Sequence, residues 1–128
     1  MKLLLDTHVA LWAITDDVKL GSVAKSLILA PDNDIWVSVV SLWEIAIKHS
    51  LRKEGMPISA SEALDYFVAS GYNLLSIEAK HTLLLSELPL HHQDPFDRLL
   101  IAQARTESMQ LMSRDGHIAK YKDSVISI

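Results

Sequence analysis

The chain begins with an apolar run, Leu3-Leu4-Leu5, that does not alternate with polar residues. A strand of this kind is covered on both faces, as in the middle of a parallel sheet that lies between helices. The run ends at Asp6, and Thr7 is a suitable cap for a helix over residues 8–14. Because open α/β sheets bind ligands beyond the carboxyl ends of their strands, we expect functional chemistry at Asp6.

Helical and strand patterns alternate along the rest of the chain. Apolar residues spaced three and four apart predict helices, and short runs rich in β-branched residues predict strands. The expected helices cover residues 22–30, 42–51, 59–70, 78–88 and 96–109, and the expected strands cover residues 35–40, 73–77, 110–113 and 125–126. Ser41 is expected to cap the helix over 42–51, and residues 52–57 and 89–95 to form loops. The alternation predicts one α/β domain, residues 1–128, with a mainly parallel sheet.

The composition is typical of one globular domain, with 128 residues, 49% hydrophobic and 22% charged. The absence of cysteine excludes disulfides and thiolate metal sites. No apolar run is long enough for a signal peptide or a membrane span, so we expect a soluble, cytoplasmic protein. The net charge of −4 counts against a protein that coats nucleic acid, although carboxylates gathered around metal ions would contribute to that charge.

Four carboxylates lie near the expected functional edge of the sheet: Asp6, Glu44, Asp97 and Asp115. Since the carboxyl ends of parallel strands share one edge, the fold can bring these distant residues together. Each also has a simpler interpretation. Asp6 and Asp115 are of a type common in turns, and Asp97 suits the first turn of a helix. Glu44 can form a surface ion pair with Lys48, four residues further on.

Asp97 has the clearest indication of an inward-facing acid, because it shares a helix face with the apolar Leu100 and Ile101. Carboxylates gathered inside a protein raise each other's pKa unless a cation neutralises them. Oxygen ligands favour Mg²⁺ or Mn²⁺ over zinc, and such ions support phosphodiester hydrolysis. Arg98 and Arg114 are neighbours of proposed ligands and are candidates for holding the phosphate.

Four segments together resemble PIN-domain proteins of the VapC toxin type. They are residues 3–7 (LLLDT), 38–48 (SVVSLWEIAIK), 91–104 (HHQDPFDRLLIAQA) and 113–115 (SRD). The resemblance extends over essentially the whole chain, and its two middle segments are long and specific. It implies an α/β/α ribonuclease that uses Mg²⁺ or Mn²⁺ and forms a homodimer. It also implies inhibition by a cognate antitoxin, whose tail enters the acidic site.

Carried over by position, the resemblance implies a catalytic and metal-binding set, which consists of Asp6, Glu44, Asp97 and Asp115. Asp94 lies in the same segment as Asp97 and is an alternative or an additional ligand. Ser113 stands where the family often has threonine, and its hydroxyl remains able to support a ligand, as does that of Thr7.

Histidine and tryptophan are the other residue types in the chain with binding chemistry. His91, His92 and Asp94 are types that bind zinc, but adjacent histidines point in different directions in most conformations. His8 and His117 lie near proposed ligands, and a structural role is expected for them in preference to RNA contact or proton relay. The three tryptophans are able to stack on bases, but their places in apolar patterns favour packing in the core or in a dimer; they are Trp12, Trp36 and Trp43.

The sequence favours a metal-dependent endoribonuclease that is the toxin of a toxin–antitoxin pair. A second possibility is a non-catalytic PIN-like module that binds RNA or a protein. A third is a phosphatase with Asp6 as nucleophile, which is disfavoured because His8 stands where such enzymes carry a second carboxylate in an Asp-x-Asp pattern.

Overall fold

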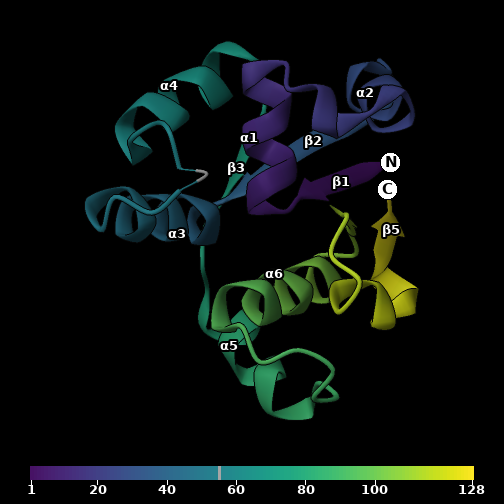
Figure 1. Cartoon of the computed structure of the whole chain (residues 1–128). Coiled ribbons are helices and arrows are strands. Elements are labelled where there is room, and N and C mark those ends of the chain that lie inside the picture. Colours follow the sequence, from purple (N-terminus) through teal and green to yellow (C-terminus); the bar gives the residue numbers. More distant parts are fainter. Residues whose placement is uncertain (55) are drawn as a thin grey trace.

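Five parallel strands form one central sheet in the computed structural model, which describes residues 1–54 and 56–128 (Figure 1). The strands are β1 (Lys2–Leu5), β2 (Asp34–Ser38), β3 (Asn73–Leu75), β4 (Gln110–Ser113) and β5 (Val125–Ser127). Their order across the sheet is β3-β2-β1-β4-β5, and every neighbouring pair is parallel. The expected α/β class is therefore confirmed, and β5 is the edge strand that the sequence predicted.

The first strand lies at the centre of this sheet. Leu4 is in register with Trp36 of β2 on one side and with Leu111 of β4 on the other. Leu3, Leu4 and Leu5 have no exposed surface, because the sheet is covered on both faces. The expectation of a doubly covered central strand is confirmed.

Helices form a layer on each side of the sheet. They are α1 (Thr7–Thr15), α2 (Ser22–Leu29), α3 (Val39–Ser50), α4 (Ala60–Ala69), α5 (Ala79–Leu84) and α6 (Pro95–Thr106). Leu3 and Leu5 belong to a core with α1, α2 and α4, whereas Leu4 belongs to a second core with α6. Figure 1 shows these layers, with α1, α2 and α4 on one side of the strands and α5 and α6 on the other. The fold is thus an α/β/α sandwich.

The second strand ends earlier than expected, and this changes the cap of α3. Ser38 accepts the N–H of Val40 at 3.0 Å through its hydroxyl, so the helix begins at Val39. The prediction of a strand to residue 40 with Ser41 as the cap is wrong. A serine hydroxyl satisfies a free amide of the first helical turn, and this local bond outweighs the β preference of the two valines.

Three further boundaries differ from the sequence predictions. The third strand is limited to Asn73–Leu75, and α5 ends at Leu84 before a single 3₁₀ turn, Leu85–Glu87. The last long helix ends at Thr106, because Ser108 adopts a left-handed conformation with φ 56°. Gly55, in the expected loop over 52–57, lies outside the described residues. Among the described residues, no helix has the length and apolarity needed to cross a membrane.

Candidate metal-binding and catalytic site

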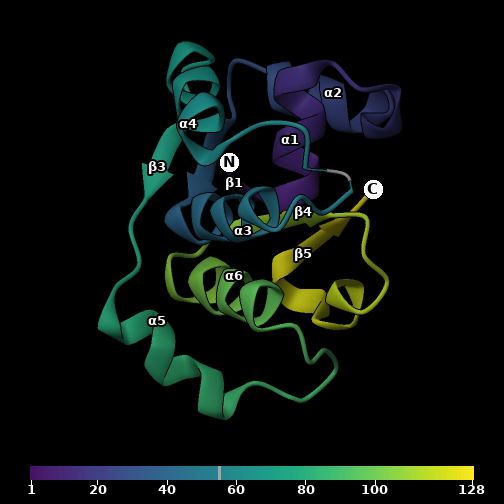
Figure 2. The same ribbon diagram turned by 60° about the vertical axis from the view of Figure 1, so that its left-hand side comes forward.

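Figure 2 shows the backbone of α1, α3 and α6 around the central strands β1 and β4. An acidic cavity of about 330 Å³ lies beyond the ends of β1 and β4, and residues of these three helices contribute to its lining. Five carboxylates line this acidic cavity: Asp6, Glu44, Asp94, Asp97 and Asp115. The four acids of the predicted set are therefore brought together, although they come from four separate parts of the chain. The parallel sheet places the ends of β1 and β4 side by side, and α3 and α6 supply the other acids.

Asp6 connects the end of β1 to the start of α1. One carboxylate oxygen accepts the N–H of Val9 at 2.9 Å, so Asp6 is the cap of α1 and the cap expected at Thr7 is wrong. The other oxygen accepts the hydroxyl of Ser113. Only 6% of Asp6 is exposed, and this burial raises the pKa of its carboxyl above 3.8 even though both hydrogen bonds lower it. A nearby cation would offset that cost of burial.

Glu44 points into the acidic cavity from α3 and is held by two partners. One oxygen accepts the Thr7 hydroxyl at 2.6 Å, and the other lies 2.5 Å from the Lys48 ammonium. The predicted Glu44–Lys48 ion pair is present, but only 3% of Glu44 is exposed, so it is not a surface pair. Burial opposes the charge of Lys48, whereas Glu44 and the more distant Asp94 and Asp97 raise its pKa overall. Lys48 is thus a counter-ion for these acids.

Asp94 and Asp97 have different tasks in the structure. Asp94 accepts the N–H of Asp97 at 3.0 Å and caps α6, which starts with Pro95 in its first turn. Asp97 lies 2.8 Å from Nε2 of His92. Burial, followed by the charges of Asp94 and Glu44, raises the pKa of Asp97 to about 7. Without a cation to stabilise its charge, Asp97 therefore keeps its proton in part up to neutral pH.

Asp115 is tied to Asp6 through one hydroxyl. Ser113 donates to the Asp6 carboxylate and accepts the N–H of Asp115 at 3.0 Å. Asp115 also accepts the N–H of His117 at 2.7 Å, so the simpler interpretation as a turn residue holds as well. Its second oxygen lies 3.6 Å from Nε2 of His92 and faces the acidic cavity. Ser113 thus fixes the relative position of two carboxylates from β1 and the end of β4.

Of the two arginines expected to hold a phosphate, Arg114 lines the acidic cavity and Arg98 does not. Arg114 lines the acidic cavity, donates to the carbonyl of Leu20 at 3.1 Å and stacks on Trp12, with 5.0 Å from its guanidinium to the ring centre. Arg98 instead donates to backbone carbonyls, among them that of Leu85 at 2.9 Å, and to the Tyr121 hydroxyl at 3.2 Å. This placement fits a structural role for Arg98 in holding the loop before α6.

His92 is a residue of the acidic cavity that the predicted set did not include. It contacts Asp97 and stacks on the ring of His117, with 5.2 Å between ring centres. His91 packs edge-on against Tyr121 instead, so the adjacent histidines do point in different directions. His92 lies in a loop, where no periodicity indicates the direction of a side chain. Its proximity to Asp97 is therefore not readable from sequence.

The donor atoms in the acidic cavity fit a hard divalent cation. His92, Asp97 and Asp115 bring ligand-type atoms within 4.8 Å of one another. Because Nδ1 of His92 accepts the N–H of Asp94 at 3.5 Å, its Nε2 donates to Asp97, and in this arrangement the carboxylates are the available ligands. The buried Asp6 and Glu44 line the same cavity, so carboxylate oxygens dominate the available donors. Oxygen-rich sites suit Mg²⁺ and Mn²⁺, and the raised pKa values of Asp6 and Asp97 mark the need for positive charge.

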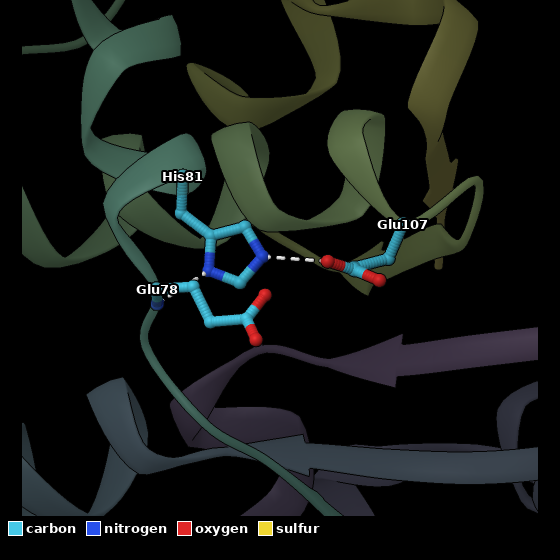
Figure 3. A group of neighbouring side chains, drawn as sticks. All are labelled: Glu78, His81 and Glu107. Atoms are coloured by element: carbon cyan, nitrogen blue, oxygen red, sulfur yellow. Dashed lines mark hydrogen bonds and ion pairs between the residues drawn. The ribbon is translucent and has the colours of Figure 1, made fainter.

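A second cluster of titratable side chains lies between α5 and the end of α6 (Figure 3). His81 is fully buried, and its Nδ1 accepts the backbone N–H of Glu78 at 3.0 Å. The neutral ring must therefore carry its proton on Nε2, which donates to Glu107 at 2.7 Å. Metal binding at Nε2 requires an unprotonated nitrogen, and Lys80 already pairs with Glu107 at 3.0 Å. This cluster is a structural connection, and it is no metal site in this arrangement.

We expect His81→Ala to lower the free energy of unfolding by about 1–3 kcal/mol, because the change leaves a cavity and removes the hydrogen bond to Glu107. Chemical denaturation measures this difference. Lys80→Ala is the matched control, since Lys80 is exposed and its loss is expected to cost less than about 1 kcal/mol. Equal losses in the two variants would contradict a structural role for His81.

This chain is a single α/β/α domain that gathers carboxylates at the carboxyl edge of its parallel sheet, so it is a compact α/β protein with an acidic site. The chain belongs to the PIN domain family, since the family's model matches residues 3–124. A comparison with curated proteins gives no significant match.

Several solved structures share the fold. VapBC2 from Rickettsia felis, bound to a DNA fragment from the promoter, has a chain with 21% identity and a TM-score of 0.71, covering 100% of this chain and 98% of that chain. A chain of a toxin–antitoxin complex from Klebsiella pneumoniae has 17% sequence identity and a TM-score of 0.58. The match covers 98% of this chain and 96% of that chain. A domain of a functionally unknown protein from Methanocaldococcus jannaschii DSM 2661 has 15% sequence identity and a TM-score of 0.61. The match covers 99% of this chain and 90% of that chain.

Proposed function

We propose that this protein is a metal-dependent endoribonuclease and the toxin of a toxin–antitoxin pair. The observation that carries the proposal is the convergence of four carboxylates, Asp6, Glu44, Asp97 and Asp115, on one cavity. Membership of the PIN domain family and the likeness to chains from toxin–antitoxin complexes support it. The catalytic and metal-binding roles of these four residues are part of the proposal.

The side chains around the acidic cavity have separate roles in the proposed reaction. Asp6, Glu44, Asp97 and Asp115 hold Mg²⁺ or Mn²⁺, which when bound supplies Lewis acidity and lowers the pKa of a water molecule. Thr7 and Ser113 orient Glu44 and Asp6 through the hydrogen bonds described above. Such supporting bonds keep ligands in place as charge changes in the site.

Two cations of the chain are suited to the RNA phosphate. Arg114 and Lys48 line the acidic cavity, and each carries a positive charge among the carboxylates. Lys48 contacts Glu44 at 2.5 Å, and its ammonium would also be available to a phosphate oxygen if Glu44 held a divalent cation. Arg114 presents a planar guanidinium that matches two phosphate oxygens. Arg98 has no part in this step, since its guanidinium is bound to carbonyls.

The proposal includes a cognate antitoxin, a homodimer and action on RNA in the cytoplasm. The two toxin–antitoxin neighbours support the first of these partners. Co-expression of the chain with the product of an adjacent gene, followed by co-purification, tests for the antitoxin. Light scattering on the purified chain, at several concentrations, tests for the dimer.

We expect purified protein to cut total cellular RNA at discrete positions with Mg²⁺ or Mn²⁺, and to lose this activity completely in chelator, because the acids cannot polarise the phosphate alone. Sequencing of fragment ends identifies the cuts. Asp6→Asn should lose at least about 100-fold in rate while keeping the acceptor that caps α1. Asp65→Asn on α4 is the matched control and should cut as wild type does.

A different outcome would favour the second function. If folded protein, free of antitoxin, leaves RNA intact with either metal but retains it in a binding assay, the protein is a non-catalytic RNA-binding module. Cuts that persist at the wild-type rate in Asp6→Asn would show that cleavage does not need Asp6, and this would contradict the assignment of the site.

A further inference from the structure

A second cavity adjoins the acidic cavity along α1. It has a volume of about 320 Å³ and shares two wall residues, His8 and Trp12, with the acidic cavity. These residues are four positions apart, so they lie on the same face of α1, and their ring centres are 6.2 Å apart. We call this second cavity the Trp12 cavity. His8 and Trp12 therefore form a wall that the two hollows share.

The lining of the Trp12 cavity combines a flat aromatic surface with polar groups. Leu11 and Pro57 supply apolar walls, whereas Asp17 and Lys19 supply opposite charges. Lys19 is exposed, as expected for a cation at a cavity rim. Flat apolar walls with a few polar groups are typical of sites for planar small molecules.

Trp12 already carries a planar partner on the side of the acidic cavity. Arg114 lines the acidic cavity, and its guanidinium lies 5.0 Å from the indole centre. The cation thus keeps the indole in a fixed orientation while its own charge remains beside the carboxylates. Trp12 is only partly buried, although it packs against the main core, so part of the ring is available to a ligand. The expected packing of Trp12 against the core is confirmed, and this packing leaves part of the residue exposed.

We propose that the Trp12 cavity binds one unpaired nucleobase of the RNA whose phosphate lies in the acidic cavity. This inference rests on the proposed function. A phosphodiester held near Asp6 and Arg114 places the adjoining base next to the shared wall of His8 and Trp12. Bases stack on aromatic side chains whatever their identity, and a base inside a duplex is already stacked and unavailable. The site therefore selects single-stranded RNA, and Trp12 positions the bond to be cut.

Cleavage kinetics on a short RNA that contains a mapped cut site test this role. Trp12→Leu keeps apolar bulk without an aromatic face and should lower kcat/KM roughly 5- to 100-fold, mainly through KM. Trp12→Phe should remain within about threefold of wild type, because it keeps a ring for stacking. Trp43→Leu is the matched control, since Trp43 is 49% exposed and does not line either cavity. It should leave KM unchanged.

An RNA with one abasic nucleotide beside the cut site isolates the stacking contact. Wild-type protein should lose the same factor on this RNA that Trp12→Leu loses on intact RNA, and Trp12→Leu should lose nothing further. Full additivity of the two losses at every position beside the cut would overturn the proposal. Thermal unfolding of each variant shows whether it is folded, and Trp12→Phe keeps the test valid if Trp12→Leu is not.

Fluorescence separates this proposal from the nuclease assignment. In a Trp36→Phe, Trp43→Phe protein, Trp12 is the single tryptophan, and a decamer of adenylate or uridylate with Mg²⁺ should quench it to saturation. Quenching without cleavage would support the base site and contradict the nuclease. Cleavage at the wild-type rate in every Trp12 variant would support the nuclease and contradict the base site. Loss of antitoxin binding in Trp12→Leu, with RNA kinetics unchanged, would assign the cavity to a protein partner and overturn the proposal.

Discussion

Asp97→Asn is expected to abolish RNA cleavage and, at the same time, to stabilise the metal-free protein. The activity falls because the change removes a carboxylate that faces Asp115 and His92 in the acidic cavity; we expect a loss of at least about 100-fold. The stability rises because a neutral amide needs no counter-charge among Asp94 and Glu44. We expect a gain of about 1–3 kcal/mol at pH 8, as measured by chemical denaturation in chelator.

The stability gain has a defined dependence on pH. The pKa of Asp97 is about 7 in the folded protein and near 3.8 in the unfolded chain. A raised folded-state pKa contributes stability that is complete below pH 3.8 and is lost as the pH rises through 7. The difference between Asp97→Asn and wild type should therefore be small at pH 4 and largest at pH 8. A difference that is constant over this range would contradict the raised pKa.

Two variants serve as controls for this prediction. Asp94→Asn retains an acceptor for the cap of α6, so it tests whether the charge of Asp94 matters apart from the cap. Asp65→Asn, on the exposed side of α4, should change neither property. Cleavage that survives in Asp97→Asn but is lost in Asp94→Asn would make Asp94 the ligand.

Metal affinity is expected to rise steeply with pH and to release a proton. Below pH 7 the Asp97 carboxyl is mostly protonated in the metal-free protein, and a cation must displace that proton. The apparent affinity for Mn²⁺ should increase by up to about tenfold per pH unit between pH 5.5 and 7 and then level off. Isothermal titration calorimetry in buffers of different ionisation enthalpy measures both the affinity and the number of protons released.

Calorimetry on the Asp97→Asn variant shows whether the released proton comes from Asp97. Asp97→Asn should bind Mn²⁺ more weakly and with a flatter pH dependence, whereas Asp65→Asn should match wild type. Release of less than half a proton at pH 6 by wild type would contradict the assignment. Because the raised pKa of Asp6 also favours a protonated carboxyl, Asp6→Asn should reduce the proton release as well.

Sequence pattern alone predicted the layered α/β fold and the inward-facing Asp97, and the family resemblance added the full set of four candidate acids. The run of three leucines predicted the central strand, because only a doubly covered strand lacks polar alternation. The helical spacing around Asp97 predicted that its carboxylate faces inward, and the structure buries it in part. These features are local, and a local pattern is sufficient to predict them.

The first residues of the helices were harder to predict, because neighbouring polar side chains compete to cap the same helix. Asp6 caps α1 in place of Thr7, and Ser38 caps α3 in place of Ser41. Both displaced residues then contribute hydroxyls beside Glu44, and Thr7 reaches it directly. A choice between neighbouring caps depends on where the strand must end in the sheet, which the sequence window does not contain.

Only the tertiary structure decided which side chains from different elements meet. It tied Ser113 to Asp6, set His92 of the loop before α6 against Asp97, turned Arg98 away from the acidic cavity and placed Trp12 between two hollows. Periodicity predicts which face of an element is apolar, and it does not predict these contacts. The sequence by itself predicted the candidate acids and the sheet edge at which they meet, whereas the packing of α1, α3 and α6 around that edge decided the geometry of the candidate site.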